Sequence, residues 1–194
     1  MISLRKLWAY SWGTIVHPAR TFEEIAADGS LAYSAVLMVV FGLLYSAIAL
    51  IAYLQGHQPS LPILISVPPA KFYLVEAVYL TPLTLQLWLL FSALCHLFAG
   101  HRRGSFDALL AVLGFSNAIP NIVAFWLPDF VSSIVFGKIL AIPMAIYGTA
   151  WFVWLIWLSG VGLTVTHRIP MCKGVLIAVA AFFAHFSIGF FFIR

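Results

Sequence analysis

Charged residues are scarce in this sequence. Asp, Glu, Lys and Arg make up 8% of the 194 residues, whereas hydrophobic residues make up 63%. Soluble domains average about 25% charged residues, so the composition excludes an ordinary soluble domain. A helix needs about 20 apolar residues to cross a bilayer, so the chain has room for roughly five or six spans. We therefore expect one all-α, polytopic membrane protein.

The signatures of several chemistries are missing as well. The sequence has no C-x-x-C or H-E-x-x-H zinc pattern and no glycine-rich phosphate-binding loop. We therefore expect no metal, no cofactor and no nucleotide hydrolysis. The Lys and Arg residues are scattered at the ends of apolar stretches, which argues against a nucleic-acid partner. Cys95 and Cys172 are expected near the cytoplasmic surface, where thiols stay reduced, so we expect no disulfide.

The first 30 residues are expected to lie at the membrane surface. An apolar stripe recurs there at helical spacing, with two cations off the stripe: Met1, Leu4, Leu7, Trp8, Trp12 and Ile15, then Arg5 and Lys6. Pro18 interrupts this interfacial helix. Thr21 and Glu24 then form a capping box that opens a short second helix, which Gly29 closes. A frayed tail is the alternative, since short helices are marginal without packing.

Apolar stretches fill the rest of the chain. The predicted spans cover about 31–54, 72–98, 108–127, 140–165 and 173–193. On the first of them, Gly42 and Ser46 share one face, where small side chains let another helix approach closely. The sequence thus predicts a five-helix transmembrane bundle over 31–194, after the interfacial segment 1–30.

The positions of the cations predict the orientation. Cationic loops are retained in the cytoplasm, and Arg102 and Arg103 form a short basic turn between the second and third spans. Of the 10 Lys and Arg residues, most fall on the same side as this turn: Arg5, Lys6, Arg20, Arg102, Arg103, Arg168 and Lys173, against Lys71, Lys138 and Arg194. We expect a cytoplasmic N-terminus and an outside C-terminus.

Polar residues within the spans allow two interpretations. Glu76 would need a partner or a raised pKa at membrane depth, which suggests a proton or cation site, or it lies close enough to the outer surface to reach water. Gln86 lies about 80° round the same helix. Asn117 and Asn121 share a face, and they either line a cavity or hydrogen-bond between helices beside Pro120.

A catalytic role finds little support. Gly114 to Ala118, GFSNA, is similar to a serine-nucleophile turn, and His185 in the fifth span could serve as a base for Ser116. Such a serine owes its reactivity to a strained strand-to-helix turn, whereas this one falls inside a predicted helix. We therefore predict no catalytic residue and keep His185 only as a polar intramembrane residue.

Three short motifs carry a resemblance to a known family. They are His17-Pro18-Ala19-Arg20-Thr21-Phe22 followed by Ile25; His96-Leu97-Phe98-Ala99-Gly100 followed by Gly104-Ser105-Phe106; and Phe115-Ser116 leading to Pro120. With five spans and a cytoplasmic N-terminus, the chain resembles the Yip family of Ypt/Rab-interacting integral membrane proteins, in particular its bacterial and archaeal members. The resemblance implies a location in a prokaryotic inner membrane. The turn departs from the usual Gly-Gly pair in having Ala99 before Gly100.

The resemblance implies a role without catalysis. Eukaryotic members are associated with small GTPases and with vesicle traffic or membrane shaping, and they tend to form complexes with one another. The Asp-Leu-Tyr-Gly type motif of their long N-terminal region has no counterpart here, so a small GTPase is weakly supported as a partner.

The function predicted from the sequence is that of a membrane scaffold. We expect a non-enzymatic organiser that associates with itself or with other membrane proteins. Its predicted contacts with anionic lipid or an acidic partner are Arg5, Lys6, Arg20, Arg102, Arg103 and Arg168. The alternative is a small transporter or channel subunit, whose polar path would use Glu76, Gln86, Asn117 and Asn121.

Overall fold

The computed structural model describes residues 3–29, 31–59, 67–100, 104–128, 130–131 and 141–189, and its regular elements there are all helices. The helices are α1 (Leu4–Val16), α2 (Pro18–Asp28), α3 (Leu31–Leu54), the 3₁₀ turn η1 (Pro69–Lys71), α4 (Phe72–Ala99), α5 (Phe106–Pro120), the π-helix η2 (Asn121–Trp126), α7 (Ala141–His167) and α8 (Met171–Gly189). The all-α fold is thereby confirmed.

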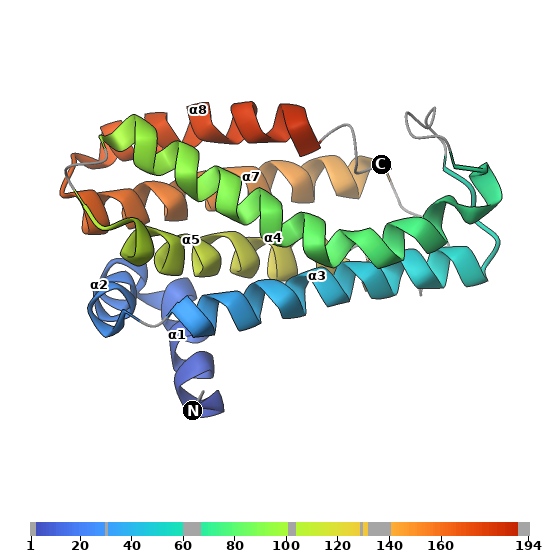
Figure 1. Ribbon diagram of the computed structural model, residues 1–194, viewed down its shortest axis with the longest axis horizontal. Coiled ribbons are helices and arrows are strands. Elements are labelled where there is room, and N and C mark those ends of the chain that lie inside the picture. The colour runs from blue at the N-terminus through green and yellow to red at the C-terminus, as the bar shows by residue number, and fades with distance from the viewer. Residues whose placement is uncertain are drawn as a thin grey trace.

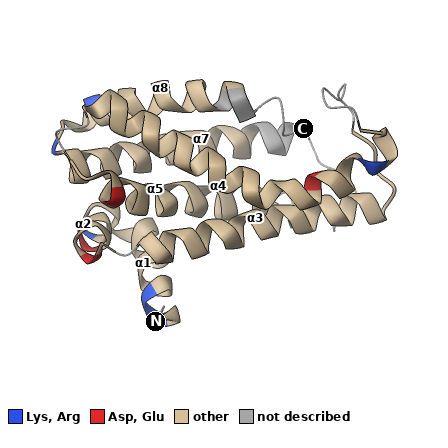
Figure 2. Ribbon diagram, in the orientation of Figure 1, with Lys and Arg blue, Asp and Glu red and all other residues tan. Residues whose placement is uncertain are grey.

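The long helices run side by side along one axis. Figure 1 shows α3, α4, α5, α7 and α8 along the length of the molecule, with α1 lying across it. Helix α2, the last turns of α4 and α7, and the first turns of α5 and α8 gather at one end, which we call the α2 end. Among the described residues, those with a charge lie towards the ends of the bundle and on α1 and α2, and none lies at its middle (Figure 2).

The lengths of the helices fit a membrane. Among the described residues, 4 helices are long and apolar enough to cross a bilayer, and α8 is apolar over Met171–His185. This confirms a polytopic helical bundle. The division into an interfacial segment 1–30 and a membrane domain from residue 31 stays a prediction.

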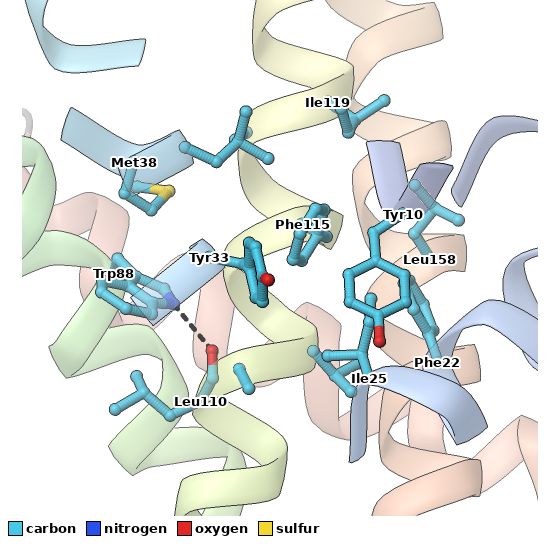
Figure 3. Packing of buried hydrophobic residues seen from close by; sticks show 14 of the residues in the cluster. Tyr10, Phe22, Ile25, Tyr33, Met38, Trp88, Leu110, Phe115, Ile119 and Leu158 are labelled. Atoms are coloured by element: carbon cyan, nitrogen blue, oxygen red, sulfur yellow. Dashed lines mark hydrogen bonds between the residues drawn. The ribbon is translucent and has the colours of Figure 1, made fainter. Parts of the chain in front are cut away.

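Helix α5 is the centre of the bundle. Every residue from Leu109 to Pro120 is buried, because this helix is apolar around its whole circumference and is enclosed by its neighbours. Phe115 packs near Tyr10 from α1 and Phe22 from α2, and the Trp88 indole of α4 donates to the Leu110 carbonyl at 3.2 Å (Figure 3). Both N-terminal helices are therefore anchored on α5.

Helices α3 and α4 form the most extensive pair. A Cβ atom on Gly42 would lie 2.6 Å from Thr84 Oγ1 and 2.8 Å from Thr81 Cα, so glycine is what allows this approach. Beside it, Ser46 Oγ lies 3.2 Å from Thr81 Oγ1. The predicted close approach at the small-residue face of Gly42 and Ser46 is confirmed.

The start of the second helix differs from the prediction. Helix α2 begins at Pro18, whose missing N–H costs nothing at the first helical position, and Thr21 is buried one turn inside. The Thr21 amide donates to the His17 carbonyl, so Thr21 is not the capping residue. The predicted end is correct: Gly29 has φ 60°, the left-handed conformation that closes a helix.

Candidate functional site

Helix α1 turns an apolar face outwards. Leu4 is 79% exposed and Trp8 72%, whereas Tyr10 on the opposite face is buried. The Tyr10 ring packs edge-on against the rings of Tyr33 and Phe115, each at a centroid distance of 5.9 Å. A helix that docks through one face and opens a Trp-bearing face outwards is suited to the headgroup layer of a membrane.

Two of the predicted cationic contacts are engaged within the protein. Lys6 Nζ donates to Asp28 Oδ1 at 2.6 Å, and this hydrogen bond raises the pKa of Lys6 above its usual value. Arg20 Nε donates to Glu24 Oε1 at 3.1 Å. Arg5, by contrast, is exposed and has no ion pair with any residue that the structure describes.

Arg168 lies in the short connection between α7 and α8. It has φ 52°, and among the described residues it is the one non-glycine with a positive φ. Such a conformation is costly and persists where the surrounding structure holds it. Arg168 and Glu23 of α2 line one pocket with a volume of ≈ 840 Å³, whose walls include Thr164 and Ile169. Arg102 and Arg103, which were predicted to act with Arg168, lie outside the described residues.

Two histidines join the ends of α4 and α7. His96 Nδ1 lies 2.9 Å from His167 Nε2, and His167 Nδ1 lies 2.9 Å from Thr166 Oγ1. The Thr166 hydroxyl donates to the Gly162 carbonyl, so it accepts from the N–H at Nδ1 of His167. His167 Nε2 then holds the lone pair that accepts from His96 Nδ1–H. In the neutral pair, both tautomers are therefore fixed.

Gly104 completes this junction. A Cβ atom there would lie 3.0 Å from His167 Cγ and would also meet the Thr166 carbonyl oxygen, so a side chain does not fit. The Phe106 ring lies 5.4 Å from the ring of His96. The two parts of the second family motif, which begin at His96 and at Gly104, therefore meet in space. In the described ranges, no group of three or more His, Cys, Asp or Glu side chains converges as metal ligands would.

The polar residues of α4 point in different directions. Glu76 is 5% exposed, so its carboxylate lies inside the bundle. The interpretation in which this side chain reaches water at the outer surface does not fit that burial. Gln86 is exposed on the outside of the bundle. The structure therefore does not place these two side chains on one path.

The two asparagines satisfy their own helix. Asn117 Nδ2 donates to the Leu113 carbonyl and Asn121 Nδ2 donates to the Asn117 carbonyl, each at 2.8 Å. Neither bond is therefore the interhelical hydrogen bond that one of the two sequence-based interpretations gave these amides. Pro120 has no N–H to donate, and the chain continues from it as the π-helix η2 without a break.

Ser116 and His185 do not form a catalytic pair. Ser116 Oγ donates to the Leu113 carbonyl at 3.2 Å and lies 3.4 Å from Ser159 Oγ. The His185 ring instead packs against Phe91 and Phe182, at centroid distances of 5.2 and 5.3 Å. Among the described residues, no hydrogen bond joins this serine to this histidine.

Apolar helices of membrane-spanning length, packed through small residues around a buried central helix, define a polytopic helical membrane protein. The Yip1 domain matches residues 12–193. The chain therefore belongs to the Yip1-domain family, as its motifs predicted. No curated protein and no solved structure matches this chain.

Proposed function

We propose that this protein is a non-enzymatic membrane scaffold that binds anionic lipid or an acidic partner at its α2 end and associates with further copies. The observation that carries the proposal is the placement of α1, which is anchored on α5 through Tyr10 and opens Leu4 and Trp8 outwards. Arg5 stands on the same helix without an internal ion pair in the described structure. An apolar face beside a cation is the combination that binds a membrane surface.

The pocket between α2 and the α7–α8 connection supports the lipid part of the proposal. Arg168 lines it without an ion pair to any described residue, so its guanidinium is available to a phosphate. Lys6 and Arg20, being paired with carboxylates, contribute less than the sequence predicted. Arg102 and Arg103 remain in the proposal as sequence-based contacts.

The proposal fixes an orientation for the chain. The α2 end faces the cytoplasm of a prokaryotic inner membrane, and the C-terminus lies outside. The excess of cations on the side of the N-terminus supports this arrangement. The apolar face of α1 then lies in the cytoplasmic headgroup layer.

Lipid retention tests the proposal. The purified full chain is analysed by native mass spectrometry with phosphatidylglycerol or phosphatidylcholine, and the fraction of protein that keeps lipid is measured. Reversing Arg102 and Arg103 to Glu, or Arg168→Glu, is expected to lower phosphatidylglycerol retention by about fivefold per cation, since each nearby cation contributes about 1 kcal/mol. Lys71→Glu, at the other end of α4, is the matched control. Unchanged retention in the three arginine variants contradicts the proposal.

The transporter alternative depends on Glu76, which is the buried carboxylate of α4. The other members of its proposed path do not join it: Gln86 points outwards, and Asn117 and Asn121 bond to their own helix. We expect no ion flux in reconstituted liposomes and no difference between the native chain and Glu76→Ala. A flux that Glu76→Ala abolishes would establish the transporter instead.

A further inference from the structure

The exposed side of α4 forms one continuous stripe. Its members recur every three or four residues and so share a face: Val78, Pro82, Gln86, Leu89 and Ala93. The opposite side of α4 packs against α3, α5 and α8. The stripe therefore has no partner within the described part of the chain, and it would face lipid in a single copy.

Gln86 lies at the middle of this stripe. Helix α4 runs from Phe72 to Ala99, so Gln86 has about 20 Å of helix on either side. The hydrocarbon core of a bilayer is about 30 Å thick, which places the Gln86 amide near its centre, beyond the reach of headgroups or water. An amide at that depth needs a hydrogen-bonding partner that lipid tails cannot supply.

The amide of Gln86 makes no hydrogen bond in the part of the chain that the structure describes. The other side-chain amides of the spans do: Asn117 Nδ2 donates to the Leu113 carbonyl and Asn121 Nδ2 donates to the Asn117 carbonyl, each at 2.8 Å. Among the side-chain amides of the described spans, the outward and unsatisfied amide of Gln86 is therefore the exception, and it points to a contact outside the chain.

We propose that the Gln86 face of α4 is the contact surface between two copies of this chain. A glutamine amide has both donors and an acceptor, so two Gln86 side chains related by a two-fold axis along the membrane normal satisfy each other. Two copies inserted in the same direction hold Gln86 at the same depth. The small side chain of Ala93 on the same stripe lets the two helices approach. The inference rests on the self-association in the proposed function and assigns its surface.

Disulfide crosslinking in membranes tests this surface. Leu89→Cys, one turn from Gln86, is placed in the full chain with the exposed Cys172 changed to Ser, and dimers are measured after mild oxidation. Val40→Cys on the outer face of α3 is the matched control, because it has similar exposure and lies about as far from the α2 end. We expect crosslinked dimers for Leu89→Cys and few for Val40→Cys.

Adding Gln86→Leu to the Leu89→Cys chain is expected to lower dimerisation by about tenfold, since it removes the interhelical hydrogen bonds, whereas Gln86→Asn keeps part of it. Unchanged helicity by circular dichroism shows that the variants fold. Absent Leu89→Cys dimers, a yield unaffected by Gln86→Leu, or crosslinking to a different protein overturns the inference. Phosphatidylglycerol retention at the α2 end is measured on the same variants, so a loss of dimers and a loss of lipid binding are told apart.

Discussion

Replacing Gly42 by alanine tests the packing of α3 against α4. The added Cβ would lie 2.6 Å from Thr84 Oγ1 and 2.8 Å from Thr81 Cα, and the second of these is backbone that cannot rotate away. The two helices must therefore separate. Overpacking of this kind costs about 1–3 kcal/mol. The separation also weakens the contact between Ser46 Oγ and Thr81 Oγ1, which at 3.2 Å contributes about 0.6 kcal/mol.

Alanine also has a favourable effect, because it forms helix more readily than glycine by up to about 1 kcal/mol. We therefore expect Gly42→Ala to lower the free energy of unfolding by about 1–2 kcal/mol. The assay is unfolding in mixed micelles with increasing SDS, followed by circular dichroism. Gly148→Ala in α7 is the control, since no atom of the described residues lies within 4 Å of the Cβ it would add. If Gly42→Ala is as stable as Gly148→Ala, the reasoning about this contact is refuted.

Two further predictions concern the α2 end. Gly104→Ala is expected to displace His167 and break its hydrogen bond with His96, which lowers the free energy of unfolding by about 1–3 kcal/mol. The NMR signals of the two imidazoles are expected to shift, and unshifted signals would contradict the described contact of Gly104 with His167. The docking of α1 is expected to weaken as the pH rises above about 10, because folding raises the pKa of Lys6 from 10.5 through its hydrogen bond to Asp28 and that of Tyr10 from 10.0 through burial. Each group contributes its full stabilisation of the docked state when the pH is below its unfolded pKa. That stabilisation is lost as the pH rises through the raised pKa of the folded protein. The fluorescence of Trp8 and Trp12 follows the release, and Lys6→Met is expected to reduce its pH dependence; an unchanged pH profile would contradict this.

Local patterns made much of the fold predictable. The run of apolar residues from Leu31 to Leu54 is the range of α3, and the cluster of small residues at Gly42 marks its contact with α4. Pro18 and Gly29 act through their own backbone conformation, so their effects on α2 could be foreseen. The capping box failed because Thr21 fits the pattern but is buried one turn after Pro18 had already begun the helix.

The candidate site depended on relations that one sequence does not display. His96 and His167 lie 71 residues apart, and no spacing rule pairs them. Hydropathy places Glu76 and Gln86 in the same span but does not say that one faces the bundle and the other faces outwards. The same holds for Lys6, which was expected to contact lipid and is held by Asp28 across the α1–α2 pair. The positive φ of Arg168 likewise has no signal in its residue type.

The side on which each end of the chain emerges tests the account most directly. An odd number of crossings puts the two ends in different compartments, and the assignment of the α2 end to the cytoplasmic surface depends on it. Reporter tags fused at Met1 and at Arg194 in cells measure this. The account predicts a cytoplasmic signal from the tag at Met1 and an external signal from the tag at Arg194. Signals from the same side would contradict it.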